Sequence, residues 1–207
     1  MIVQGSLEWL QLRAGRVTAS RVADVMARTK SGWGASRANY MAELIAERLT
    51  GVPSPSFTNA AMQHGVEQEP HARRAYAQLM GVDVVEVAFV EHPEIAMFGC
   101  SPDGLVGEDG LVEIKAPNTA THLDTLLTET VPGKYITQMQ VQMAVCGKAW
   151  CDFVSFDPRL PESMALFVKR VHRDVSHILE LETEVAAFIA EIDDKVARLT
   201  ERYASAA

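Results

Sequence analysis

The chain has 207 residues, of which 48% are hydrophobic and 22% charged, a composition typical of one globular domain with a sizeable core. No stretch approaches the roughly 20 consecutive apolar residues that a membrane span needs, and the N-terminus lacks the layout of a secretory signal. Three sparsely placed cysteines argue against a disulfide framework. We therefore expect a cytoplasmic protein without a membrane partner.

The net charge of −8 argues on its face against binding to nucleic acid, but the charges are unevenly distributed. Residues 1–40 hold six basic and two acidic side chains, whereas residues 176–203 hold three basic and seven acidic ones. This asymmetry fits a protein that binds a polyanion on one side only. It fits a surface with ordinary patches of charge equally well.

The N-terminal part, residues 1–81, is predicted to be helical. Apolar residues at helical spacing and capping residues at the ends of the segments indicate three helices: from Thr18 or Ser20 to about Arg28, from Ser36 to Gly51, and over residues 59–80. Pro70 lies inside the third segment and is expected to mark a kink or a fresh helix start. Gly81 ends that segment.

Residues 82–172 are predicted to form the core of a sheet, because β-branched residues in partly alternating order indicate strands. The predicted strands are 82–91, 95–100, 104–107, 111–116, 149–156 and 164–172, and the predicted helices between them are 119–129 and 134–146. Asp174 begins a C-terminal helix, residues 174–204. The order of elements predicts a single α/β (α+β) domain over residues 1–207, with a central mixed sheet flanked by helices.

The stretch CSPDGLVGEDGLVEIKAP is typical of a β-hairpin with the acidic sequence GEDG at its tip. Symmetric pairing about this tip places Val106 opposite Leu111. Asp103 then falls opposite Glu113 or Ile114, within one step of register. Directly opposed residues have Cβ atoms about 4.5–5.5 Å apart, so the two carboxylates are expected to lie close together.

Lys115 follows Glu113 by two residues on the same strand, so both side chains point to one face. Two close carboxylates repel each other unless a cation lies between them, and Mg²⁺ prefers oxygen ligands. With a lysine to stabilise charge on a phosphate, Asp103, Glu113 and Lys115 predict a site for metal-dependent phosphodiester hydrolysis. The alternative is an acidic hairpin with a compensating lysine, although the surrounding residues are typical of a core, where unpaired charges are uncommon.

Four motifs in order resemble those of a nuclease family. The pattern PDG…EIK resembles the metal-binding motif of the PD-(D/E)xK nuclease superfamily. The segments WLQLRAGRVTAS, HGVEQEPHAR and YITQMQVQMAV resemble the N-terminal signature, the Gly-x3-Glu helix and the glutamine-rich helix of the lambda exonuclease family, also called the YqaJ-type viral recombinase or alkaline exonuclease family. The motifs span residues 9–145. The resemblance implies a restriction-endonuclease-like core.

The resemblance also implies a role for each matching residue. It implies two Mg²⁺ ions, with Mn²⁺ as an alternative, held by Asp103, Glu113, the backbone carbonyl of Ile114 and, through water, Glu69. Lys115 would activate or position the attacking water, and Gln138 would help to order the site. The alternative for Gln138 is a purely structural role, in which it forms a hydrogen bond with Gln142, one helical turn away.

A pocket for the 5′-phosphate of a DNA end is implied by the same resemblance. Arg13, Ser20 and Ser101 match its arginine and serines, and an arginine beside hydroxyl donors is a good phosphate receptor. The second arginine that the family can place after the catalytic lysine is missing, and we expect His122 to substitute for it. Lys30 lies where a DNA-contacting arginine can sit.

The function implied is a Mg²⁺-dependent 5′-to-3′ exonuclease that digests one strand of double-stranded DNA to mononucleotides and leaves a 3′ single-stranded tail. The implied partners are two further copies of the chain in a ring-shaped homotrimer and a single-strand annealing protein of phage-type recombination. The chain would then be a phage or prophage protein in a bacterial host. The alternatives are an endonuclease or RecB-type repair nuclease, a non-catalytic scaffold that binds DNA ends, and a small-molecule metal hydrolase.

Overall fold

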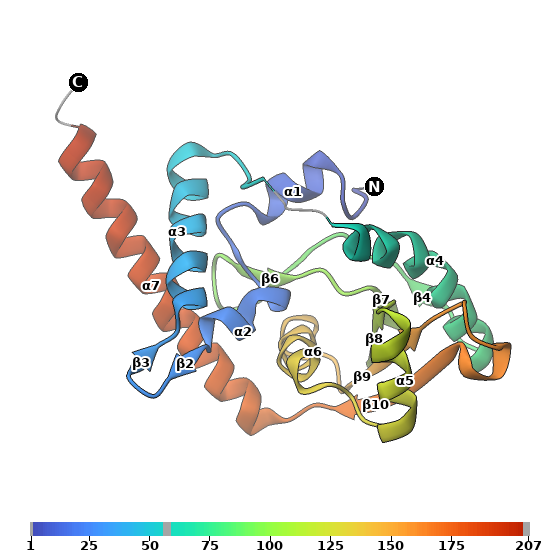
Figure 1. The fold of residues 1–207 in the computed structure, drawn as a ribbon. Helices are drawn as coiled ribbons and strands as arrows, with labels where there is room; N and C mark the ends of the chain where they lie inside the picture. Colours follow the sequence, from blue (N-terminus) through green and yellow to red (C-terminus); the bar gives the residue numbers. More distant parts are fainter. Residues whose placement is uncertain (1, 56–58, 205–207) are drawn as a thin grey trace.

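The computed structural model describes residues 2–55 and 59–204 (Figure 1). The first elements are α1 (Leu7–Arg13), β1 (Val17–Thr18), η1 (Ala19–Arg21), α2 (Val22–Val25), β2 (Arg28–Thr29), β3 (Gly32–Trp33), α3 (Ala35–Thr50) and α4 (Ala60–Met80). They are followed by β4 (Val84–Val85), β5 (Val90–Glu91), β6 (Phe98–Cys100), β7 (Gly104–Val106), β8 (Gly110–Lys115), α5 (Thr119–Thr128), α6 (Gly133–Cys146), β9 (Trp150–Phe156), η2 (Glu162–Met164), β10 (Leu166–His172) and α7 (Val175–Ala204). No helix within the two described ranges is long and apolar enough to cross a membrane.

The main sheet has five strands in the order β10-β9-β8-β7-β4, and a smaller sheet has the order β1-β6-β5. In the main sheet β8 and β9 are parallel and the other neighbours are antiparallel, which confirms the predicted mixed sheet. Ala72 and Tyr76 of α4 pack on one face, in a cluster with Val112 and Ile114 of β8. On the other face, α6 packs in a cluster with Leu111 of β8.

The C-terminal ends of two N-terminal helices are where their glycines predict them. Gly51 ends α3 and Gly81 ends α4, both in the left-handed conformation that glycine adopts without a steric penalty. Ser36 is not the N-cap of α3, because the helix already begins at Ala35, and Asn59 caps α4 with its side chain. The helix α4 is continuous through Pro70, so the proline starts no new helix.

Three further elements differ from the sequence predictions. The helix expected over residues 18–28 is limited to η1 and α2, because the chain then turns into the two-stranded hairpin of β2 and β3. The helix α1 was not predicted; its N-cap Ser6 accepts a hydrogen bond from the Trp9 N–H, but none of its residues is buried. The strand expected over residues 82–91 is divided, since β4 pairs with β7 in the main sheet and β5 pairs with β6 in the smaller one.

The hairpin of β7 and β8 forms as predicted, with a register one residue away from the symmetric one. Leu105 pairs with Leu111, and Gly104 pairs with Val112. One further step along this register sets Asp103 opposite Glu113. Glycine is required at position 104 because a Cβ atom there would lie 2.1 Å from Cγ1 of Val84 on β4. The Gly of the PDG motif therefore lets β4 and β8 approach β7 from both sides.

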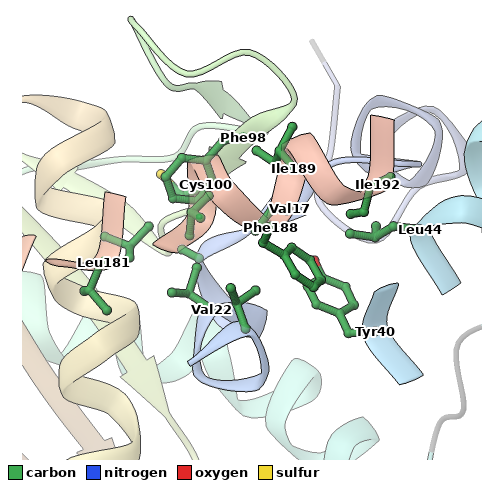
Figure 2. Close-up of a cluster of buried hydrophobic side chains, with 14 of the residues drawn as sticks. Val17, Val22, Tyr40, Leu44, Phe98, Cys100, Leu181, Phe188, Ile189 and Ile192 are labelled. Carbon is green, nitrogen blue, oxygen red and sulfur yellow. The ribbon is translucent and has the colours of Figure 1, made fainter. Parts of the chain in front are cut away.

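The C-terminal helix α7 supplies much of a second core, which Figure 2 shows. Its buried residues follow helical spacing on one face: Ile178, Leu181, Val185, Phe188, Ile189 and Ile192. The Phe188 ring stacks on Tyr40 of α3 with the ring centroids 5.9 Å apart. Val141 and Val145 of α6 belong to the same cluster. Thus α7 holds α3 and α6 together.

Ion pairs add a second set of contacts between the N-terminal part and α7. Arg28 pairs with Glu184 at 3.1 Å. From α3, Arg37 pairs with Glu191 at 2.7 Å and Arg48 pairs with Asp193 of the same helix. Three of the seven basic side chains in residues 1–50 are therefore paired with the acidic C-terminal helix.

We predict that Phe188→Ala lowers the free energy of unfolding by about 3–5 kcal/mol, because the fully buried ring leaves a cavity between α7 and α3. Leu179→Ala on the same helix is the matched control, since Leu179 is 64% exposed and its truncation should change stability by less than about 0.5 kcal/mol. Urea unfolding followed by circular dichroism measures both. Equal losses for the two variants would contradict this role of α7.

Candidate active site

The β7–β8 hairpin brings the predicted acidic residues together. Oδ2 of Asp103 accepts a hydrogen bond of 2.6 Å from the backbone N–H of Ile114, which fixes the aspartate against the neighbouring strand. Glu113 and Lys115 lie on the same face of β8, and their side chains form an ion pair. Ile114 points to the opposite face and packs in the cluster that α4 covers. Alternation along a strand therefore gathers the charges on one side and anchors the strand on the other.

The Glu113 carboxylate is completely buried and is held by two glutamines of α6. Gln138 donates from Nε2 to Oε1 at 2.7 Å, and Gln142 donates from Nε2 to Oε2 at 2.6 Å. The two glutamines are one helical turn apart, so both reach the same carboxylate. The alternative that Gln138 and Gln142 bond only to each other is wrong. The glutamine-rich helix therefore supplies the hydrogen-bond donors that the buried Glu113 carboxylate needs.

The charges of the hairpin shift one another's ionisation. Burial raises the pKa of Asp103 well above its ordinary value, and the neighbouring Glu113 carboxylate raises it further. Burial alone would lower the pKa of Lys115, but the attraction of Glu113 and Asp103 outweighs it and the pKa is raised above its ordinary value. Lys115 is therefore a stable cation, while the carboxylates repel one another at close range.

The helix α4 adds Glu69 to this group. Burial raises the pKa of Glu69; Arg73 lowers it, and Glu113 raises it again, which shows that the helix carboxylate and the hairpin carboxylates share one electrostatic site. Arg73 forms an ion pair with Glu69 and donates from Nε to the backbone carbonyl of Asp103 at 3.1 Å. Arg73 thus links Glu69 of α4 to the main chain at Asp103 of the hairpin.

These residues fit a Mg²⁺ site. Three carboxylates, Asp103, Glu113 and Glu69, face only two cationic side chains, Lys115 and Arg73, so a divalent cation would relieve the repulsion. Among residues 2–55 and 59–204, no three His, Cys, Asp or Glu side chains converge closely enough to form a complete metal cluster. That does not exclude Mg²⁺, which typically takes one or two protein carboxylates and keeps several waters.

The predicted phosphate pocket is partly assembled beside the hairpin. Nη1 of Arg13 donates to the Ser101 hydroxyl at 3.2 Å, and the guanidinium lies over the Trp9 ring, 4.0 Å from its centroid. The Trp9 indole N–H donates to the same hydroxyl at 3.0 Å. Ser20 follows β1 and Ser101 follows β6, and these strands are parallel neighbours, so both serines leave the sheet at the same end.

Arg13 is suited to receive an anion. Burial lowers its pKa from the ordinary value, and the nearby Tyr40, Cys100 and Glu47 only partly offset this shift. The two groups that the guanidinium contacts, the Ser101 hydroxyl and the Trp9 ring, carry no negative charge. A partly buried guanidinium with neutral partners gains from a phosphate that offers charge-assisted hydrogen bonds.

The structure does not bring His122 or Lys30 to this pocket. His122 is fully buried, with Nδ1 2.7 Å from the Ser155 hydroxyl and Nε2 2.8 Å from the backbone carbonyl of Met164, so neither ring nitrogen is free for a phosphate. It ties α5 to β9 instead. Lys30 is exposed in the turn between β2 and β3, and that hairpin lies beside α7 in Figure 1, away from β7 and β8.

Three residues of the site carry no assignment from the sequence. The sequence indicates Gln142 only as a hydrogen-bond partner of Gln138. The spacing of four residues is also compatible with a shared partner, which is the Glu113 carboxylate. The indole N–H of Trp9 donates to both the Ser101 hydroxyl and the backbone carbonyl of Ala88. Arg73 lies four residues after Glu69, a spacing that predicts an ion pair. Its contact with Asp103 depends on how α4 crosses the sheet.

A mixed sheet flanked by helices, with an acidic hairpin at its centre, defines a restriction-endonuclease-like fold. The family is shown by the YqaJ-like viral recombinase domain, which matches residues 8–149, and the chain belongs to that family. Among curated proteins, none matches the sequence.

Solved structures agree with this assignment. The crystal structure of an alkaline exonuclease, LHK-Exo from Laribacter hongkongensis, shares 54% sequence identity with the chain and has a TM-score of 0.90, covering 98% of this chain and 100% of that one. LHK-Exo in complex with dAMP gives the same values. A phage related exonuclease from Haemophilus somnus 129PT has a TM-score of 0.72 at 16% identity, covering 89% of this chain and 96% of that one, and shows the shared fold alone.

We predict that Gln142→Leu lowers the free energy of unfolding by about 1–3 kcal/mol, because it leaves Oε2 of the buried Glu113 without its donor. Gln78→Leu is the control, since Gln78 is an exposed residue of α4. Urea unfolding measures both variants. If Gln142→Leu is as stable as the control, the glutamine does not stabilise the carboxylate.

Proposed function

We propose that this protein is a Mg²⁺-dependent exonuclease that degrades one strand of double-stranded DNA from its 5′ end. One observation carries the proposal: the fully buried Glu113 carboxylate is held by two glutamines and a lysine, beside Asp103 and Glu69. Burying charged groups costs free energy, and clusters of buried ionisable groups with shifted pKa values are found preferentially at functional sites. The family and the alkaline exonuclease at 54% identity support a nuclease that acts on DNA ends.

The side chains divide the chemistry of phosphodiester hydrolysis between them. Gln138 and Gln142 hold Glu113 in one orientation, and a backbone N–H holds Asp103, so that both carboxylates are preorganised. Lys115 stays protonated beside Glu113, and its ammonium group can stabilise negative charge on the scissile phosphate. When bound, Mg²⁺ would neutralise charge on the phosphate and supply an activated water.

The residues that would hold the metal are those that the resemblance to the lambda exonuclease family implies. One ion would take Asp103, Glu113 and the backbone carbonyl of Ile114 as ligands, and a second would contact Glu69 through water. Mn²⁺ can replace Mg²⁺, since both accept oxygen ligands.

The direction of digestion follows, in this proposal, from the Arg13 pocket. A terminal 5′-phosphate bound by Arg13, Ser101 and Ser20 would place the first phosphodiester bond of that strand at the carboxylates. The product would then be a mononucleotide, and LHK-Exo has been crystallised in complex with a mononucleotide, dAMP. The other strand would remain as a 3′ single-stranded tail.

We further propose that three copies of the chain form a ring around the DNA and that the tail is passed to a single-strand annealing protein. The resemblance to lambda exonuclease supports the ring, and membership of a viral recombinase family supports a role in phage-type recombination. In this view the protein comes from a phage or prophage.

The decisive experiment is digestion of end-labelled linear duplex DNA by the purified protein, with Mg²⁺ and with EDTA. We expect Mg²⁺-dependent release of mononucleotides from 5′-phosphorylated strands and no digestion of covalently closed circles. Intact linear DNA in Mg²⁺ would overturn the proposal, and cleaved circles would indicate an endonuclease. Asp103→Asn should abolish digestion but keep end binding, whereas Asp109→Asn, at the exposed tip of the same hairpin, should digest normally. If Asp103→Asn changes nothing, the hairpin is not catalytic.

We predict that Arg13→Gln reduces the preference for 5′-phosphorylated over 5′-hydroxyl ends by about tenfold or more, because a hydrogen bond to a charged group contributes about 1.5–3 kcal/mol. The ratio of initial digestion rates on the two substrates measures this preference. Arg28→Gln, which removes the same charge but pairs with Glu184, should leave the ratio unchanged. An unchanged ratio for Arg13→Gln would contradict the pocket.

A further inference from the structure

Arg73 makes three polar contacts with three separate segments of the chain. Nη2 pairs with Glu69 on the same helix, Nε donates to the backbone carbonyl of Asp103 at 3.1 Å, and Nη1 lies 2.9 Å from Oε2 of Glu86. The Arg73 side chain is only 12% exposed. One rigid guanidinium group thus joins α4, the residue before β7 and the segment after β4.

Two of these contacts, with Glu69 and with Asp103, involve residues of the proposed metal site. They are made by different nitrogens of one planar guanidinium group. The Nη2 contact restrains the Glu69 carboxylate, and the Nε contact restrains the main chain at Asp103. Because the guanidinium fork is rigid, these contacts fix the spacing between the Glu69 carboxylate and the main chain that carries Asp103. A lysine has a single nitrogen at the end of a flexible stem and cannot make both contacts in a fixed geometry.

An ordinary surface ion pair would explain only part of this geometry. Exposed Arg–Glu pairs one helical turn apart stabilise a helix by about 0.3–0.5 kcal/mol and serve no other element. Arg73 instead reaches across to the backbone of another segment, and its outer partner Glu86 is 68% exposed. The partly buried contacts to Glu69 and Asp103 are therefore the ones that a variant should test.

We propose that Arg73 is a positioning residue that sets the geometry of Glu69 and Asp103 for divalent-cation binding. The inference rests on the proposed function, since it assumes that these carboxylates hold the metal. Arg73 itself touches neither the metal nor the substrate; it acts through the two residues that it holds. Groups that orient metal ligands typically change metal affinity or activity by about 10–100-fold when they are removed.

The experiment compares Arg73→Gln and Arg73→Lys with the wild type and with Arg74→Gln. Arg74 is the matched control, because it is the next residue of α4, is exposed and hydrogen-bonds to His71. Mn²⁺ binding to the DNA-free protein is measured by titration calorimetry, and the Mg²⁺ concentration for half-maximal digestion is measured separately. We expect both Arg73 variants to weaken Mn²⁺ binding and to raise the half-maximal Mg²⁺ concentration by about tenfold or more, while Arg74→Gln matches the wild type.

A second readout separates positioning from general damage. At saturating Mg²⁺, the KM for a 5′-phosphorylated duplex should stay unchanged, because the Arg13 pocket is intact, and the loss should fall on kcat. Circular dichroism and thermal melting check folding; if Arg73→Gln is unfolded, Arg73→Lys decides the question on the same measurements. Glu86→Gln should leave Mn²⁺ binding unchanged, since it removes only the exposed partner.

The outcomes distinguish the inference from the proposed function. If the wild type binds Mn²⁺ and digests DNA while Arg73→Lys shows the metal dependence of Arg74→Gln, Arg73 has no positioning role. If the wild type neither binds Mn²⁺ nor digests DNA, the proposed function fails and the inference fails with it. A loss of Mn²⁺ affinity in both Arg73 variants, with KM unchanged, supports the inference.

Discussion

The buried carboxylate of Glu113 is the constraint on which the rest of the site depends. A charged group with no solvent exposure must be given hydrogen bonds and a counter-charge by the protein itself. Its neighbour Lys115 supplies the charge, and Gln138 and Gln142 supply the hydrogen bonds. For this to work, α6 must cross the sheet with one particular face toward β8. A small rotation of α6 would leave the carboxylate unsatisfied, so the packing of this helix is also the geometry of the site.

The C-terminal helix α7, which carries no recognisable motif, helps to keep α6 in this orientation. Val141 and Val145 lie on the side of α6 that joins the core cluster formed by α7. Leu181 and Phe188 of α7 belong to the same cluster, and Phe188 stacks on Tyr40 of α3. The helix α7 therefore supports α6 from behind, and through α6 it holds the glutamines against Glu113. Although α7 contributes no residue to the site, it affects the site because it determines where α6 lies.

The sequence predicted the features that depend on contacts between residues close together in the chain. The closeness of Asp103 and Glu113 follows from hairpin geometry, and Gly51 and Gly81 end their helices because glycine adopts the left-handed conformation easily. Tertiary contacts decided the rest. A continuous strand-like run was divided because its two halves pair in different sheets. His122 occupies a plausible place in the sequence, yet the approach of α5 to β9 buries it against Ser155. Nothing within a few residues of either feature carries that information.

The fold also changes how the uneven distribution of charge along the sequence is interpreted. Arg37 and Arg28 of the basic N-terminal part pair with Glu191 and Glu184 of the acidic C-terminal helix, and Arg16 and Arg21 pair with carboxylates elsewhere in the chain. Four of the six basic side chains in residues 1–40 are thus compensated by ion pairs and add little to a basic face for DNA. Arg13 differs, because its guanidinium contacts an indole ring and a hydroxyl group rather than a carboxylate. In the proposed function, a protein of net charge −8 would recognise a DNA end through a few directed contacts to one terminal phosphate, rather than through a positive field along the duplex.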